Sequence, residues 1–181
     1  MSIGKILVLG GARSGKSRFA LQLCKDAAAR AFLATAQAFD DEMKQRIDLH
    51  INERKNLGFA NFEEPIDVTL KMQSIAQQGY HTVILDCLSL WISNLLLADL
   101  SDDVISEKLK TFVDWIQHSS SSYVMVGNEV GLGIVPDNRL ARRFRDLNGR
   151  LHQDLSAVCD ECYYAVAGNA VPLKRLGQPI Q

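Results

Sequence analysis

The sequence lacks several features that would assign it to a specialised class of protein. It has only four cysteines in 181 residues, too few for a disulfide framework in a chain of this size. Twenty basic residues against 21 acidic ones leave a formal net charge of −1. Bulk electrostatics therefore favours neither nucleic acid nor an anionic membrane as a partner.

Long hydrophobic runs are also missing. The N-terminal run MSIGKILVLGG is too short for a signal peptide, and the longest apolar stretch, 85–97, is interrupted by Asp86, Ser89, Ser93 and Asn94. Neither reaches the roughly 18 apolar residues of a membrane-spanning helix. We therefore expect a soluble, cytoplasmic protein.

Two of the cysteines, Cys159 and Cys162, form a single CxxC pair. A structural zinc site usually needs a second pair or two histidines at suitable spacing. The four histidines of the chain do not provide that spacing. We therefore assign the pair no metal or redox role.

Short apolar runs alternate with segments of helical periodicity. The apolar runs occupy 5–9, 31–35, 82–86, 123–126 and 163–167, and the helical segments occupy 17–30, 40–54, 104–116 and 138–158. Runs that are apolar at nearly every position are typical of strands covered on both faces. This alternation predicts an α/β fold with a mostly parallel sheet and helices on both faces. We find no linker, so residues 1–181 are predicted to form one domain.

A phosphate-binding motif follows the first apolar run. The motif G-x-x-x-x-G-K-[ST] is matched by Gly10, Gly11, Ala12, Arg13, Ser14, Gly15, Lys16 and Ser17. Glycines let backbone N–H groups turn toward phosphate oxygens, and the following helix presents its N-terminus to the anion. In such a loop Lys16 would reach the β- and γ-phosphates, and the Ser17 hydroxyl would bind Mg²⁺. The sequence thus predicts a nucleoside triphosphate site.

An acidic residue ends the third apolar run. A P-loop enzyme needs an acid at the end of a neighbouring strand to hold Mg²⁺ directly or through water, and Asp86 occupies that position. Because a helical pattern follows, Asp86 could instead cap the next helix. We favour the Mg²⁺ role, and both roles are compatible.

Three polar residues share one face of the second predicted helix. Arg46, His50 and Arg54 are spaced four residues apart. Two guanidiniums beside an imidazole could bind phosphates, and a neutral imidazole can act as a nucleophile or base near pH 7. A solvated basic face paired with Asp48 and Glu53 explains the pattern equally well.

Other polar positions are less specific. Glu63, Glu64 and Asp67 look like the N-terminal region of the next helix. The segment 128–133 follows the fourth apolar run, where ligands bind in α/β sheets, but it could be a plain turn. Five arginines lie on the last long helix: Arg139, Arg142, Arg143, Arg145 and Arg150. They could bind phosphates, although a solvated or subunit-contacting face is the more common reason for each.

Four segments together resemble one enzyme family. They are GGARSGKSRFA at 10–20, ATAQAFDDEMKQRIDLHINER at 34–54, LDCLSLWISNLL at 85–96 and NEVGLGIVPDNRLARRFRDLNGRLHQ at 128–153. The P-loop is shared by many enzymes, whereas the second and fourth segments are far more specific. The chain resembles the bifunctional adenosylcobinamide kinase / adenosylcobinamide-phosphate guanylyltransferase family over nearly its whole length.

The resemblance implies more than the residue patterns do. It implies a RecA-like fold, a homotrimer, and two reactions on a corrinoid substrate. Adenosylcobinamide is phosphorylated with ATP or GTP, and GMP is then transferred from GTP to give adenosylcobinamide-GDP. A histidine matching His50 would carry GMP covalently. Nucleotide contacts would fall on the P-loop and on Thr35, Ala36, Gln37, Ile51, Asn52, Glu53, Arg54, Glu63 and Asp86.

The chain departs from the family pattern at a few positions. Gly127 stands where a serine is expected, Leu49 precedes His50 where some relatives carry a second histidine, and the assignment of Glu63 rather than Glu64 is open. Two other hypotheses remain. One is a kinase of another small metabolite without a covalent intermediate, and the other is a RecA-like ATPase or regulatory module.

Overall fold

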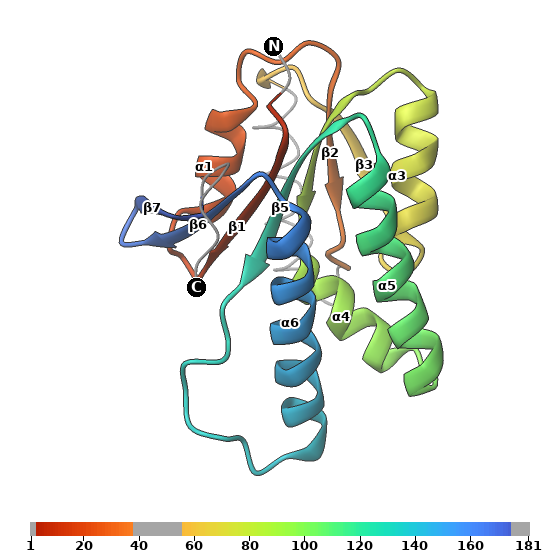
Figure 1. Cartoon of the computed structure of the whole chain (residues 1–181), viewed down its shortest axis with the longest axis vertical. Helices are drawn as coiled ribbons and strands as arrows, with labels where there is room; N and C mark the ends of the chain where they lie inside the picture. The colour runs from red at the N-terminus through yellow and green to blue at the C-terminus, as the bar shows by residue number, and fades with distance from the viewer. Residues whose placement is uncertain (1–2, 38–55, 175–181) are drawn as a thin grey trace.

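A sheet of seven strands organises the described part of the chain (Figure 1), which in this computed structural model comprises residues 3–37 and 56–174. The strand order is β3-β2-β4-β5-β1-β6-β7. All neighbouring strands are parallel except β6 and β7, which form an antiparallel hairpin. The strands are β1 (Lys5–Gly10), β2 (Arg30–Ala34), β3 (Ala60–Glu63), β4 (Thr82–Asp86), β5 (Ser122–Asn128), β6 (Glu161–Val166) and β7 (Asn169–Lys174).

Five described helices cover the two faces of the sheet. They are α1 (Lys16–Leu23), α3 (Val68–Gln77), α4 (Leu88–Leu97), α5 (Asp102–His118) and α6 (Arg139–Val158). None of these five combines the length and apolar character that crossing a membrane requires.

Alternation along the strands creates two separate cores. Leu7 and Leu9 of β1 face a cluster that includes residues of α3, α4, α5 and α6. Ile6 and Val8 face the other way and pack with Ala20 of α1. Successive strand side chains point to opposite faces, so strands buried on both sides must be apolar throughout. The predicted α/β fold with a mostly parallel, two-faced sheet is confirmed.

The five predicted strands are all present, with ends shifted by a few residues. The helix predicted over 17–30 was too long, because α1 ends at Leu23. Ala29 adopts a positive φ of 48°, and the Arg30 side chain binds backbone carbonyls of the turn, including Ala27 O at 3.3 Å. The Arg30 contacts order the turn that connects α1 to β2. The helix predicted over 40–54 lies outside the described residues.

Two edge strands were not anticipated from the sequence. β3 is a four-residue strand whose side chains are only partly buried or exposed, and β7 is largely exposed and contains Pro172. Edge strands need no continuous apolar pattern, and they tolerate proline because one side has no partner strand. Periodicity therefore gives little signal for either.

Gly127 of β5 has a packing reason to lack a side chain. A Cβ atom there would overlap His152 Nε2 from α6 and lie 3.0 Å from Leu9 Cδ2. His152 is 5% exposed, and neither ring nitrogen has a hydrogen-bond partner in the described structure. Burial lowers the pKa of His152 to about 4, although the Glu129 charge opposes the shift, so the ring is neutral at pH 7. The expected serine would not fit beside this ring.

We predict that Gly127→Ala lowers the free energy of unfolding by about 1–3 kcal/mol, because the added methyl group overpacks the space beside His152. Urea unfolding would measure the change. Gly133→Ala is the matched control, since a Cβ at Gly133 meets nothing within 4 Å. Adding His152→Ala to Gly127→Ala should give less than the sum of the two single losses. If Gly127→Ala is as stable as Gly133→Ala, the steric account is wrong.

Candidate functional site

The phosphate-binding motif forms the connection between β1 and α1. Gly15 is the N-cap of α1 with a φ of 97°, and Gly10 ends β1 with a φ of 150°. Both values lie in the region that favours glycine. A Cβ at Gly10 would also overlap the Ala165 carbonyl and lie 2.9 Å from Ser14 Oγ. The two motif glycines are therefore required by the backbone conformation of this loop.

Neighbouring strands brace the loop on two sides. Gly168, in the β6–β7 turn, donates its backbone N–H to Ser14 O at 3.0 Å. Glu129, just after β5, donates its N–H to Gly10 O at 2.9 Å. The loop is thus fixed at both its start and its end by main-chain bonds.

Lys16 places a buried ammonium inside this loop. The residue is 7% exposed, and Nζ donates to Gly11 O and, at 3.4 Å, to Ser14 Oγ. Burial lowers the pKa of Lys16, while the charge of Asp86 opposes that shift. Within residues 3–37 and 56–174 the hydrogen bonds of the Lys16 ammonium go to a carbonyl and a hydroxyl oxygen. A buried ammonium gains further from an anionic ligand, such as phosphate oxygens.

Asp86 ends β4, where it is in register with Ala34 of β2 and Val126 of β5. The helix-cap alternative for Asp86 was wrong, because the N-cap of α4 is Cys87, whose Sγ accepts from Leu90 N at 3.4 Å. The Asp86 carboxylate instead lies close enough to Lys16 for its charge to act on that ammonium.

Asp86 and Ser17 have the chemistry that Mg²⁺ requires. A carboxylate and a hydroxyl are oxygen ligands of the kind this ion prefers, and Mg²⁺ usually takes its remaining ligands from water and phosphates. Ser17 is exposed in the first turn of α1, and Asp86 is partly buried. Asp86 ends β4, which lies on the opposite side of β1 from the β6–β7 hairpin. No group of three or more metal-binding His, Cys, Asp or Glu side chains occurs within 3–37 and 56–174. The residues fit an ion carried in with a triphosphate.

Comparisons with known proteins show which family the chain belongs to. Residues 6–173 match the family described as cobinamide kinase / cobinamide phosphate guanyltransferase. The chain belongs to this family. It is 39% identical over 175 residues to the bifunctional adenosylcobalamin biosynthesis protein CobP of Pseudomonas aeruginosa, covering 96% of this chain and 98% of that protein. It is 38% identical over 182 residues to CobU of Salmonella typhimurium, covering 93% and 99%.

Solved structures extend the comparison to the fold alone. Flagellar accessory protein FlaH from Methanocaldococcus jannaschii matches with a TM-score of 0.56 and 15% identity, covering 97% of this chain and 80% of that one. A KaiC-like protein from Pyrococcus horikoshii OT3 matches with a TM-score of 0.51 and 11% identity, covering 90% and 71%. The predicted RecA-like fold is confirmed.

Among the nucleotide contacts expected in a cobinamide kinase / guanyltransferase, Thr35 has its side chain committed inside the protein. Its hydroxyl donates to Cys87 O at 2.8 Å and accepts from Cys87 N at 3.0 Å, and the residue is fully buried. Asn94 Nδ2 also donates to Thr35 O at 2.8 Å. Thr35 therefore joins the ends of β2 and β4, whereas Ala36 is partly buried and Gln37 is exposed beyond it.

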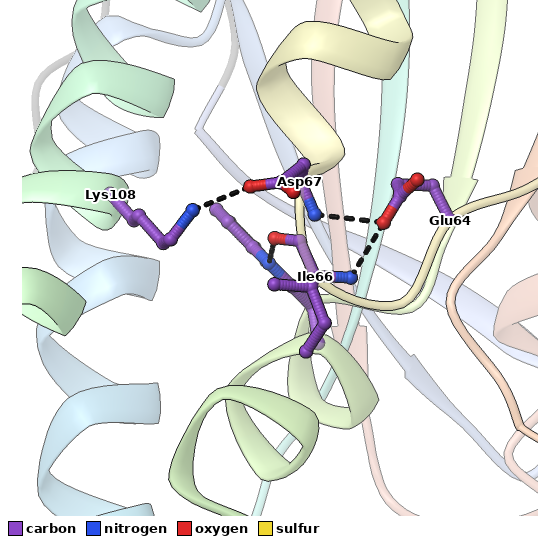
Figure 2. A network of polar contacts seen from close by, with 5 residues as sticks. Glu64, Ile66, Asp67 and Lys108 are labelled. Atoms are coloured by element: carbon purple, nitrogen blue, oxygen red, sulfur yellow. Dashed lines mark hydrogen bonds and ion pairs between the residues drawn. The ribbon is translucent and has the colours of Figure 1, made fainter. Parts of the chain in front are cut away.

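Glu63 and Glu64 have different surroundings (Figure 2). Glu64 Oε1 accepts backbone N–H groups from Ile66 and Asp67, both at 2.9 Å. Asp67 in turn accepts from Lys108 Nζ at 2.6 Å. Glu64 is thus occupied in ordering the turn before α3, while Glu63 is exposed at the carboxyl end of β3. Of the two, Glu63 is the one whose carboxylate this turn does not engage.

Most of the α6 arginines examined from the sequence contact their own chain. Arg142 donates to Pro136 O at 2.9 Å and also to Asp137 O, which closes the base of the β5–α6 loop. Arg143 pairs with Asp102, and Arg145 Nε lies 3.7 Å from Asp146 Oδ1. These three guanidiniums therefore have partners within their own chain.

One polar cluster near the site was missed by sequence reasoning. Ser89 Oγ donates to Asn148 Oδ1 and accepts from Asn128 N, both at 2.8 Å, and Asn148 Nδ2 donates to Asn128 O at 2.9 Å. These residues come from α4, β5 and α6. Their cluster fixes the end of β5 next to the P-loop. No local sequence pattern predicts this cluster, because its residues are far apart in the sequence.

The second-helix residues lie outside the described part of the chain. These are Arg46, His50, Ile51, Asn52, Glu53 and Arg54. Their roles stay predictions from the sequence.

We predict that Asp86→Asn raises the Mg²⁺ concentration for half-maximal kinase activity roughly tenfold. Loss of one charge-assisted contact costs about 1.5–3 kcal/mol, and 1.4 kcal/mol is a factor of ten. The measurement is a Mg²⁺ titration at fixed ATP and adenosylcobinamide. Asp103→Asn, at an exposed acid of α5, should match the unmodified chain. An unchanged titration for Asp86→Asn would remove the metal assignment.

Proposed function

We propose that this chain phosphorylates adenosylcobinamide with ATP or GTP and then transfers GMP from GTP to give adenosylcobinamide-GDP. The observation that carries the kinase step is the buried Lys16 ammonium in a glycine-framed loop, close to the Asp86 charge, in a chain of the cobinamide kinase / guanyltransferase family.

The kinase step depends mainly on the P-loop. The hydroxyl oxygen of the aminopropanol arm attacks the γ-phosphorus, the bond to the β-phosphate oxygen breaks, and the hydroxyl proton is released. Lys16 neutralises charge on the transferred group, and backbone N–H groups of the loop hold the β-phosphate. Bound Mg²⁺, held by Ser17 and Asp86, would supply further positive charge at the phosphates.

Guanylyl transfer needs a different group, and we assign it to His50. A ring nitrogen attacks the α-phosphorus of GTP, and pyrophosphate leaves. The phosphate oxygen of adenosylcobinamide phosphate then attacks the same phosphorus and releases the histidine. Neutral imidazole suits both steps because it is nucleophilic near pH 7 and its phosphoramidate is reactive.

The placement of the other three histidines supports His50. His81 precedes β4 and His118 ends α5 before β5, so both lie at the amino ends of strands whose carboxyl ends adjoin the P-loop. His152 is buried against β5, with a pKa near 4. None of the three is positioned to reach a triphosphate held by Lys16.

Three finer assignments belong to the same proposal. The enzyme acts in the cytoplasm, where ATP and GTP are available. It uses Mg²⁺ with its nucleotides. It assembles as a homotrimer, and the β5–α6 loop supports association because its apolar residues Leu132, Ile134 and Val135 are 83%, 95% and 66% exposed.

We predict that GTP labelled at the α-phosphate leaves label on the protein, stable to alkali and lost in acid, with one GMP on the His50 peptide by mass spectrometry. His50→Ala should lose the label and reduce guanylyl transfer roughly 10³-fold or more, since a nucleophile is removed. Its kinase activity should remain measurable.

His118→Ala is the matched control, because His118 is an exposed histidine far from the P-loop, and it should label normally. A His50→Ala protein that still labels and still makes adenosylcobinamide-GDP would contradict the covalent mechanism. Normal kinase activity with no labelling of the unmodified chain would favour a kinase without a covalent intermediate.

A further inference from the structure

A small pocket lies beside the P-loop, on the side away from Asp86. Its volume is about 70 Å³, and its lining includes Ser14, Gly15, Arg18, Gln22, Gly168 and Asn169. Two of these residues belong to the P-loop, two to α1 and two to the β6–β7 hairpin. The pocket is thus a cleft between α1 and the hairpin, directly continuous with the phosphate-binding loop.

The hairpin wall of this pocket is held in place. Gly168 bonds to the P-loop through Ser14 O, and a Cβ on Gly15 would lie 3.3 Å from Gly168 Cα. Lys174 at the end of β7 donates to Ser156 O at 2.6 Å, which ties the hairpin to α6. Phe19, on the α1 wall, packs edge-on against Tyr163 of β6 at 5.1 Å. A ligand entering the cleft therefore meets two preformed walls.

The position of Asp86 in the sheet gives the phosphoryl donor a direction. In the order β4-β5-β1-β6-β7, Asp86 ends a strand on one side of β1 and the hairpin lies on the other. The Lys16 ammonium, whose partner charge is Asp86, binds β- and γ-phosphates in loops of this type. With the γ-phosphate toward Asp86, the α-phosphate and nucleoside extend toward the hairpin.

We propose, resting on the kinase activity above, that the purine of the phosphoryl donor binds in this cleft between α1 and the β6–β7 hairpin. Gln22 and Asn169 contact its edge, and the Arg18 guanidinium lies against its face. The pocket volume admits one edge of a purine, so the rest of the ring stays in contact with solvent.

The side chains at the cleft explain why the donor can be ATP or GTP. A side-chain amide carries both donors and an acceptor, so Gln22 and Asn169 can pair with the edge of adenine or of guanine after a rotation. A guanidinium plane stacks on either ring. All three side chains are exposed, and Asn169 must exchange its Nδ2 hydrogen bond to Ala167 O, 3.1 Å long, for one to the purine when it turns. Such a site binds purines and discriminates little between them.

The guanylyl donor would use the opposite side of the loop. Thr35 and Glu63, expected to contact guanine nucleotide, end β2 and β3, which lie beyond β4 from β1. A base bound there is separated from the hairpin cleft by the width of several strands. The two reactions would then place their purines on opposite sides of one P-loop.

The test uses Gln22→Ala and Asn169→Ala in the full-length enzyme. Each should raise the KM for ATP in the kinase reaction about fivefold, the value of one hydrogen bond. The kcat of the kinase should stay within about twofold. The KM for GTP in guanylyl transfer, assayed from adenosylcobinamide phosphate, should not change. Gln77→Ala, at an exposed glutamine on the last turn of α3, should alter neither reaction.

A direct measurement accompanies the kinetics. Photolysis of 8-azido-ATP on the unmodified enzyme should label peptides of α1 or the β6–β7 hairpin. Unchanged KM for ATP in both variants, equal increases for both reactions, or labelling confined to β2–β3 peptides would each overturn the cleft assignment. An unmodified enzyme without kinase activity would instead refute the proposed function itself.

Discussion

The buried ammonium of Lys16 is the constraint on which the candidate site depends. Lys16 is 7% exposed, so its ammonium loses most of its hydration. Nearby oxygens or negative charge must offset that loss. The P-loop gives it Gly11 O and Ser14 Oγ, and β4 brings the charge of Asp86. These partners keep the ammonium in the loop but satisfy it less well than phosphate oxygens would. The fold thus holds a charge whose best partner is a ligand.

The order of the strands places Lys16 between two groups of strands. β1 carries the P-loop in the interior of the sheet, with β5, β4, β2 and β3 on one side and the β6–β7 hairpin on the other. Main-chain bonds from Gly168 and Glu129 fix the loop from both sides. A nucleotide gripped at its phosphates can therefore lay its base toward either edge. One loop can in this way serve a kinase and a guanylyltransferase.

Short-range sequence patterns predicted the P-loop and the strand that ends at Asp86. Features that depend on residues far apart in the sequence could not be predicted in this way. The strand–loop–helix of the P-loop and the acid at Asp86 were predicted correctly in position, because neighbouring residues specify them. The cap of α4 was not, since Cys87 is a weak capping residue that only the structure reveals. Gly127 departs from the family pattern, and the reason is His152, which is 25 residues later in the chain and packs beside it. The role of His50 comes from family resemblance, which no local rule supplies.

We infer that the buried charge of Lys16 serves to bind phosphate and does not stabilise the fold. The substitution Lys16→Met tests this inference most directly. Methionine fills similar space without a charge. The measurement is the Kd for Mg²⁺·ATP by calorimetry, made on protein whose unfolding temperature is recorded. The account predicts a Kd weakened at least about tenfold, with an unfolding temperature that is not lowered. An unchanged Kd, or a loss of binding explained by a loss of folding, would contradict it.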